Sequence, residues 1–498
     1  MEQVAIVVAL VTGVIAVSAA SRRWGLPAPI VLVLAGIAVS FVPGLPEIRL
    51  EPELVLVVVL PPLLYATAVR SSLIDIRRNA RTIGSLAVGL VLATVVAVGF
   101  GLHAVVPGIS LAAAMALGAV VGPPDAVATS AVARRSDLDR QTLTVLEGES
   151  LFNDATALVA LQVALAAVAG QVGALSIAGR FVLVGLGGLA VGVAIGALLS
   201  WIRRHVHDTL TDSAVSLVAP FAAFIPAELL NVSGVVAVVV TGLILAHRSP
   251  VDQDPQARLV DNAVWSTAQF VLEGAVFALI GLQLHGIVTS TDWDRSELLL
   301  SSVVVLGAVV LVRPAWIFGM THLARIAPWR SNGTPPLNQL AVVSWAGMRG
   351  VVSLAAALSL PIASDRRGLL LVLTVVVIIG TLVVQGLTLP WVIRRLGIEP
   401  PDPRLDTLQR ARAQELAGDA ALLRLHELEA GEHPPPEVVE ALERKVELGR
   451  FMVWERLADE GAAGMRSSRS PLRSSDSFIA WVSRASSRSS CCCTARSR

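Results

Sequence analysis

The sequence has few charged residues. Only 15% of its 498 residues are charged and 54% are hydrophobic, whereas a soluble domain carries about 25% charged residues. The formal net charge is +1, so binding to nucleic acid has no electrostatic support. The shortage of charge excludes an ordinary soluble protein and predicts a chain that mostly contacts the lipid bilayer.

Cysteine is almost absent as well. The three cysteines are consecutive, Cys491, Cys492 and Cys493, near the end of the chain. Their position excludes a framework of structural disulfides, and their spacing matches no metal-ligand motif. They could be palmitoylated or reactive, but we favour an end without function, and we expect no cofactor.

Long hydrophobic runs make up most of what is present. A membrane-spanning helix needs about 20 mostly apolar residues. Thirteen segments approach this requirement: 3–20, 27–43, 51–69, 82–106, 110–133, 141–169, 181–202, 213–230, 233–247, 262–284, 298–323, 337–362 and 368–393. Segment 213–247 could form one span or two, because Asn231–Gly234 is the only turn signal there. We predict two short spans there.

Arginines between the segments predict the orientation. Most of them follow odd-numbered spans, for example Arg77, Arg78, Arg203 and Arg204. Because cytoplasmic loops carry the excess of basic residues, we expect the N-terminus outside and the C-terminus in the cytoplasm. The expected location is a bacterial inner membrane.

The composition changes near Pro400. We predict a transmembrane domain over 1–398, a cytoplasmic helical tail over 399–465 and a disordered end rich in Ser and Arg over 466–498. The tail alternates charged and apolar residues at helical spacing, which favours two soluble helices.

Two hydrophobic segments are interrupted. The fifth contains Gly122–Asp125 and the twelfth contains Gly347–Gly350. If the seventh span is a connector, spans 1–6 and 8–13 form inverted repeats, and the breaks fall at matching positions. Broken helices expose backbone carbonyls and dipole ends that can hold an ion, so we expect them to cross near the membrane midplane. Simple proline kinks would explain neither the adjacent carboxylate nor the adjacent arginine.

The sixth span adds a second carboxylate. An ionised side chain at bilayer depth costs at least roughly 2.5–3.5 kcal/mol, and its usual use is to handle an ion or a proton. Ser150 and Asp154 are four residues apart and share one helix face, while Glu149 and Asn153 form the neighbouring row. We predict a sodium site at Asp154, Asp125 and Ser150. Because a proton and the cation compete for one carboxylate, such a site can support exchange.

Further buried charges need partners. Arg349 lies in the twelfth span, and we predict an ion pair with Glu149, with Glu147 as the rival partner. Glu273 and Arg313 are secondary candidates that could pair with each other.

Three motifs together carry a family resemblance. The runs Gly122–Ala128, Leu146–Asp154 and Trp345–Leu354 resemble monovalent cation:proton antiporters, with the bacterial NhaP-like branch of sodium/proton exchangers as the nearest likeness. The resemblance covers about residues 5–395. It implies a homodimer in which a six-helix core moves like an elevator against a dimerisation domain.

The resemblance also implies roles for single residues. Asp154 would carry the ion and the proton, and the Asn153-Asp154 pair would mark electroneutral exchange. Glu273 matches an acidic or amide position of several branches. Many relatives have Thr where this sequence has Pro124, which keeps a carbonyl ligand and loses a hydroxyl.

We therefore expect an electroneutral sodium/proton antiporter and not an enzyme. Potassium/proton exchange is the main alternative, and lithium is a further candidate cation. A transport-inactive sensor is a distant alternative. An intramembrane aspartyl protease is disfavoured because neither Asp125 nor Asp154 lies in a Gly-x-Gly-Asp element.

Overall fold

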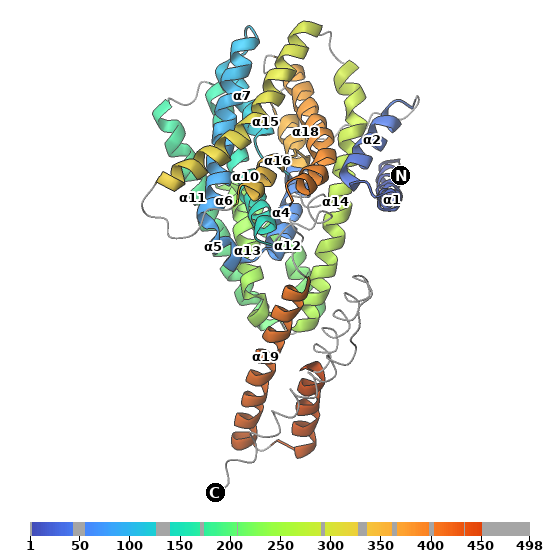
Figure 1. Cartoon of the computed structure of the whole chain (residues 1–498), viewed down its shortest axis with the longest axis vertical. Helices are drawn as coiled ribbons and strands as arrows, with labels where there is room; N and C mark the ends of the chain where they lie inside the picture. Colours follow the sequence, from blue (N-terminus) through green and yellow to red (C-terminus); the bar gives the residue numbers. More distant parts are fainter. Residues whose placement is uncertain are drawn as a thin grey trace, which may run out of the picture. The chain divides into compact units, whose positions relative to one another are not determined.

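The computed structural model describes residues 2–42, 55–125, 140–169, 174–206, 208–289, 294–326, 336–360, 366–397, 403–432 and 434–450. The chain divides into two compact units, Met1–Pro400 and Pro401–Arg498. All regular structure in the described ranges is helical, as Figure 1 shows.

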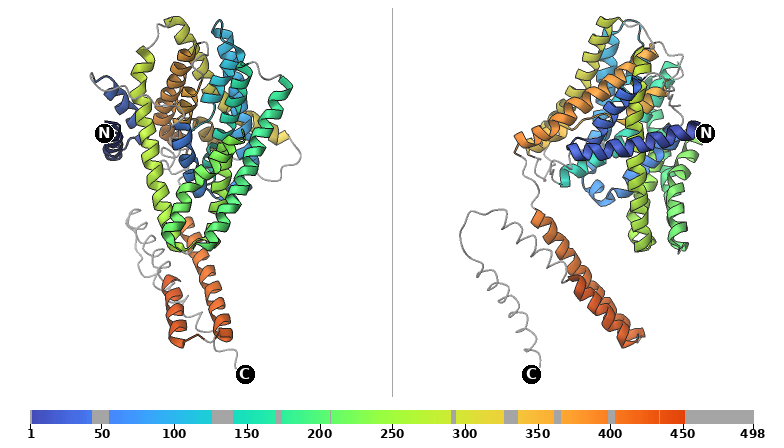
Figure 2. Two further views of the ribbon diagram at one scale, coloured as in Figure 1. Left: turned by 180° about the vertical axis from the view of Figure 1, so that it is seen from behind. Right: turned by 90° about the vertical axis from the view of Figure 1, so that its right-hand side faces the viewer.

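The first unit is a bundle of helices. It begins with α1 (Glu2–Trp24), α2 (Ala28–Ser40), the π-helix η1 (Val55–Val59), α4 (Leu60–Arg70), α5 (Leu73–Arg78), α6 (Ala80–Gly84), the π-helix η2 (Ser85–Leu90), α7 (Val91–Val105), α8 (Leu111–Val121) and α10 (Arg140–Val168). It continues with α11 (Ala174–His205), α12 (Thr209–Leu229), α13 (Gly234–Asp252), α14 (Pro255–Thr289), α15 (Arg295–Ile326), α16 (Leu337–Trp345), α17 (Val351–Leu358) and α18 (Arg367–Arg395). The long helix α14 packs along α2 and α1 in Figures 1 and 2.

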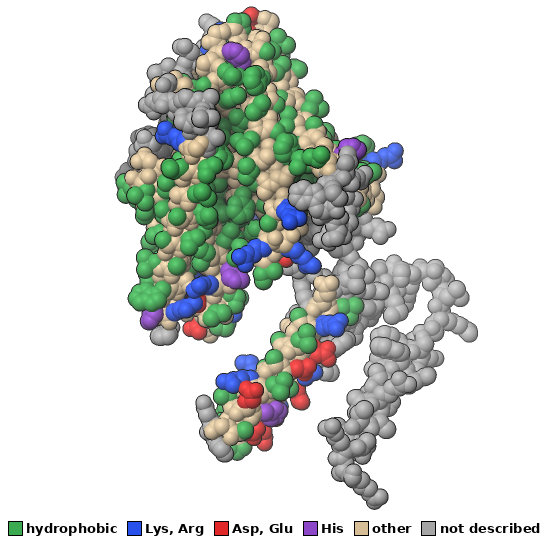
Figure 3. Space-filling view, turned by 90° about the vertical axis from the view of Figure 1, so that its left-hand side faces the viewer, with side chains coloured by type: hydrophobic (Ala, Val, Ile, Leu, Met, Phe, Trp, Pro, Cys, Tyr) green, Lys and Arg blue, Asp and Glu red, His purple; other side chains and the backbone are tan. Residues whose placement is uncertain are grey.

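The expected membrane class is confirmed. Nine helices within the described ranges are long and apolar enough to cross a membrane, and shorter apolar helices cover 28–40, 57–70 and 111–121. On the face of the first unit seen in Figure 3, hydrophobic side chains cover most of the surface, and Lys and Arg side chains gather toward its lower edge. The count of thirteen spans stays a prediction.

The division within 213–247 has a local cause. Asn231 adopts a left-handed conformation, with a φ of 55°. Ser233 then caps α13, since its side chain accepts a hydrogen bond from the backbone N–H of Val236 at 3.3 Å. These two residues end α12 and start α13, so the predicted pair of helices is confirmed.

Both predicted helix breaks are present. Helix α8 ends at Val121 and the chain runs without helix to Asp125, while residues 126–139 lie outside the described ranges. Residues 346–350 separate α16 from α17. The two interruptions touch, because the backbone N–H of Asp125 donates to the carbonyl of Met348 at 2.7 Å.

The second unit contains α19 (Pro403–Glu432) and a further helical stretch over 436–450. Arg450 on the second stretch pairs with Asp419 on the first at 3.0 Å. Residues 451–498, with Cys491, Cys492 and Cys493 and the expected disordered end at 466–498, lie outside the described ranges.

Candidate ion-binding site

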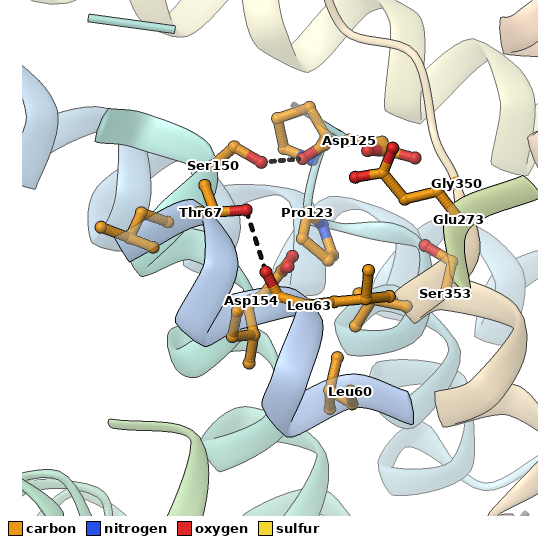
Figure 4. Close-up of a pocket in the computed structure, with 14 residues that line it drawn as sticks. Leu60, Leu63, Thr67, Pro123, Asp125, Ser150, Asp154, Glu273, Gly350 and Ser353 are labelled. Carbon is orange, nitrogen blue, oxygen red and sulfur yellow. Dashed lines mark hydrogen bonds between the residues drawn. The ribbon is translucent and has the colours of Figure 1, made fainter. Parts of the chain in front are cut away.

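A cavity forms where the broken segment after α8 meets α10. It has about 570 Å³ of empty volume, including space open to solvent. Its lining comes from α4 (Leu60, Leu63, Leu64, Thr67), the broken segment (Pro123, Pro124, Asp125), α10 (Ser150, Leu151, Asp154), α14 (Glu273), and the second break with α17 (Gly350, Val352, Ser353). Figure 4 shows these side chains around the opening.

Helix α10 presents its two polar rows in different directions. Ser150 and Asp154 line the cavity, and Asp154 is 8% exposed. Glu149 and Asn153 are buried and are not among the lining residues. The helical period therefore separates the residues that can meet an ion from those that support them.

The carbonyl of Pro124 holds the broken segment against α10. It accepts hydrogen bonds from Ser150 Oγ at 3.2 Å and from Asn153 Nδ2 at 3.0 Å. A carbonyl oxygen has two lone pairs, and both are used here. In this arrangement Pro124 and Asn153 position the segment, and the donated hydrogen bond holds the Ser150 hydroxyl at the cavity wall.

The carboxylate of Asp125 lies against Gly350, in the space that the side chain of any other residue at position 350 would fill. A Cβ atom at Gly350 would overlap the carboxylate of Asp125. Asp125 also interacts electrostatically with Asp154 and with Glu273. The expected neighbours Asp125, Ser150 and Asp154 thus line one cavity.

Glu273 brings a third carboxylate to the cavity from α14. Its Oε1 accepts a hydrogen bond from Gln269, one turn earlier on the same helix. Within the described ranges no three His, Cys, Asp or Glu side chains are close enough to hold a metal ion together.

The predicted ion pair between Glu149 and Arg349 is wrong. Both carboxylate oxygens of Glu149 accept hydrogen bonds from Arg313, and the bond from Nη2 to Oε2 is 2.7 Å long. Arg349 instead donates from Nε to the carbonyl of Val121 at 2.7 Å, and from Nη1 to the carbonyl of Gly347. The break after α8 leaves the carbonyl of Val121 without a helical partner, and the guanidinium satisfies it.

Arg313 serves the second broken helix in the same way. Its Nε donates to the carbonyl of Val343 at 2.9 Å, in the last turn of α16. The suggested pair between Glu273 and Arg313 is therefore also wrong, since Arg313 is engaged by Glu149 and Val343. Glu147, the rival partner suggested for Arg349, lies partly buried on α10 outside the cavity lining.

Two hydroxyl groups at the cavity were not predicted. Thr67 on α4 bonds to the carbonyl of Leu63 at 3.0 Å, a contact drawn in Figure 4, and Ser353 on α17 is buried. A single hydroxyl in an apolar span is ordinary. In the sequence, only Ser353 could have been singled out as a candidate, because it lies three residues after the second break.

Comparison with known proteins identifies the family. The model of the family described as "Sodium/hydrogen exchanger, transmembrane" matches residues 6–395. The chain belongs to the sodium/hydrogen exchanger family. This membership confirms the resemblance expected from the three motifs, and it makes the chain a member of a family of secondary transporters rather than of enzymes.

Several relatives agree with this membership. An uncharacterized Na+/H+ exchanger of Mycobacterium bovis is 35% identical over 477 residues, covering 92% of this chain and 86% of the relative. A sodium, potassium, lithium and rubidium/H+ antiporter of Bacillus subtilis is 32% identical, covering 77% of this chain and 61% of the relative. The sodium proton antiporter MjNhaP1 of Methanocaldococcus jannaschii matches in structure with a TM-score of 0.65 at 18% identity, over 80% of this chain and 99% of that one. The last likeness shows a shared fold.

Proposed function

We propose that this chain is an electroneutral sodium/proton antiporter in which sodium and a proton compete for the carboxylate of Asp154. The observation that carries the proposal is the place of this side chain, which is almost wholly buried and yet lines the cavity beside Asp125. A carboxylate at membrane depth is costly and normally serves an ion or a proton. The description of the family model supports the same pair of substrates.

The charge balance supports one-for-one exchange. One carboxylate binds either one sodium ion or one proton, so both loaded forms carry the same charge. Asn153, the neighbour of Asp154 on α10, adds no second charge. Asp125 and Ser150 supply further oxygen ligands of the kind that hard cations prefer.

The division of the cavity supports an elevator-type movement. Helices α4 and α14 contribute part of the lining, and α10, α17 and the two breaks contribute the rest. A buried arginine ties one member of each set to helices outside the lining. Arg313 joins α15 to α10 and α16, while Arg203 joins α11 to α12 and α14. We propose that the set containing α10 moves against the set containing α14 and carries the ion across.

The family resemblance extends the proposal to the assembly and its place in the cell. We propose a homodimer in a bacterial inner membrane, with the N-terminus outside and the C-terminus in the cytoplasm. The arginine-rich loops after odd-numbered spans support this orientation. No cofactor is needed for exchange by competition at a carboxylate.

Potassium/proton exchange is the second candidate. The relative from Bacillus subtilis is named for sodium, potassium, lithium and rubidium, so related cavities accept cations of several sizes. A transport-inactive sensor remains the distant alternative, because Asp125, Ser150 and Asp154 are all in place.

The test is proton movement in everted membrane vesicles from cells that lack other antiporters. Sodium, potassium or lithium chloride is added, with and without a clamp on the membrane potential. The expected result is that sodium relieves the quenching of a fluorescent pH probe, and that this response is the same with and without the clamp on the membrane potential. A response to potassium alone would change the substrate and keep the mechanism. No proton movement with any of the three cations, from mildly acidic to alkaline pH, would contradict the proposal.

A further inference from the structure

Ser353 on α17 has a hydroxyl group without a partner. The residue is 1% exposed, and its Oγ makes no hydrogen bond within the described ranges. A buried hydroxyl can donate one hydrogen bond and accept two, and leaving these unused costs stability. Buried polar groups are nearly always paired, so an unpaired one at this position needs a reason.

The helix break explains why the usual partner is missing. A serine within a helix commonly donates to the carbonyl three or four residues earlier, as Ser344 on α16 does to Leu340 at 2.7 Å. The residue four positions before Ser353 is Arg349, which lies in the break before α17 begins at Val351. Three positions before it is Gly350, whose ψ of −143° is outside the helical range. The first turn of α17 therefore offers this hydroxyl no helical carbonyl.

The unpaired hydroxyl belongs to the wall of the cavity. Ser353 is one of the lining residues, and Figure 4 shows it across the opening from Asp154 and on the same side as Glu273. Ser18 and Ser213 are also buried without a partner in the part of the chain that the structure describes, but neither lines the cavity. Among these three serines, only Ser353 can meet an ion that occupies the cavity.

We propose that Ser353 is a further ligand of the transported cation, which it holds from the wall opposite Asp154. The carboxylates of Asp125, Asp154 and Glu273 line the same cavity, so its electrostatics favour a cation over an anion. Hard cations prefer oxygen ligands, and a hydroxyl can turn its lone pairs toward the ion and its hydrogen away from it. This role rests on the proposed function and adds a residue to its site.

Ser353 differs from Thr67, the other hydroxyl of the lining, in two respects. Thr67 donates its hydrogen to the carbonyl of Leu63 at 3.0 Å, whereas the hydrogen of Ser353 has no acceptor within the described ranges. Thr67 also lies on α4, in the set of helices against which α10 is proposed to move. Ser353 lies on α17, in the same set as Asp154, so it can stay beside the ion throughout the movement. Both broken helices then supply a ligand to the moving site.

Thermal unfolding of the purified full chain in detergent tests the role apart from transport. The melting temperature is measured against sodium chloride concentration, with choline chloride keeping the ionic strength constant. In Ser353→Ala we expect the sodium concentration that gives half of the stabilisation to rise about tenfold, the effect of one lost contact to a charged group. Without sodium, the variant should melt no lower than the wild type, because no hydrogen bond is lost.

Two further variants separate a ligand from a structural residue. Ser353→Cys fills nearly the same space with sulfur, a poor ligand for hard cations, and should weaken sodium binding as Ser353→Ala does. Ser344→Ala is the matched control, because Ser344 is a buried serine in the other half of the same broken helix and lies outside the cavity lining. It should leave the half-maximal sodium concentration unchanged. Wild-type sodium dependence in both Ser353 variants would overturn the proposal, and would mean that the hydroxyl only binds water.

Cation preference in proteoliposomes tests the same role during exchange. Small cations are the more costly to dehydrate, so the loss of one oxygen ligand should raise the KM of Ser353→Ala more for lithium and sodium than for potassium. An equal change for all three cations, or no change, would overturn the proposal. If none of the three cations stabilises or is exchanged by the wild type, the proposed function itself fails. Stabilisation and exchange in the wild type, with an unchanged Ser353→Ala protein, refute only the role of Ser353.

Discussion

Removing one partner of the Glu149–Arg313 pair should destabilise the protein strongly. Two hydrogen bonds join the side chains, both of which are buried. Hydrogen bonds to charged groups contribute about 1.5–3 kcal/mol each, so the pair amounts to about 3–6 kcal/mol. Measured losses from breaking buried pairs are of the same size, about 3–5 kcal/mol, because the remaining charge is left uncompensated. Glu149→Gln and Arg313→Gln should each cost several kcal/mol.

The double variant distinguishes this pair from the alternative with Arg349. Once Glu149→Gln is present, Arg313→Gln should cost much less than it does alone, with a coupling energy of about 1–3 kcal/mol. The assay is thermal unfolding of purified protein in detergent, and the coupling is read from the shifts in melting temperature of the two single variants and the double variant. The matched control is Glu297→Gln, which removes a partly exposed pair with Arg366 and should cost at most about 1 kcal/mol. Additive losses for Glu149 and Arg313 would refute the assignment, and stronger coupling of Glu149 to Arg349 would restore the pair expected from the sequence.

Three further predictions concern the cavity. Gly350→Ala should raise the KM for sodium roughly 10–100-fold in a transport assay, because the added methyl group displaces Asp125. Gly307→Ala is the control and should leave the KM unchanged, because the space around Gly307 is open. Asn153→Asp should cost about 1–3 kcal/mol in thermal unfolding, because an ionised carboxylate cannot donate to Pro124; an unchanged melting temperature would contradict that role. The KM for sodium should rise about tenfold per unit as the pH falls below the range in which the transport carboxylate is ionised, with kcat unchanged, and a KM independent of pH would exclude competition.

Local features of the sequence predicted the helices and their breaks. Asn231 and Ser233 separate α12 from α13 through a left-handed conformation and a cap, both of which act within a few residues. Glycine and proline end α8 before Asp125 for equally local reasons. The helical period likewise placed Ser150 and Asp154 on one face.

The partners of the buried charges could not be predicted in this way. Arg313 and Arg349 both lie in apolar segments, and either could have met Glu149. The choice depends on how α15 packs beside α10 and on which broken helix end each guanidinium reaches. The unsatisfied carbonyls of Val121 and Val343 decide it, and they exist only once the breaks have formed.

The partners of Arg203, which are Asp212 and Asp261, could not be predicted from the sequence either. Arg203 counted in the sequence as one of the basic residues of a cytoplasmic loop. In the structure it is buried between Asp212 and Asp261, because α11, α12 and α14 meet at that end. A loop arginine and a buried arginine have the same sequence signature when the acids that pair with them come from other helices.

The measurement that tests the central claim most directly compares Asp154→Asn with the wild type in proteoliposomes. Sodium-driven proton flux is recorded with the membrane potential clamped, and stabilisation by sodium is read from the melting temperature of each protein. Asp154→Asn should fold, as judged by gel filtration, and should show neither flux above empty liposomes nor stabilisation by sodium. Robust exchange by the folded Asp154→Asn protein would contradict the account.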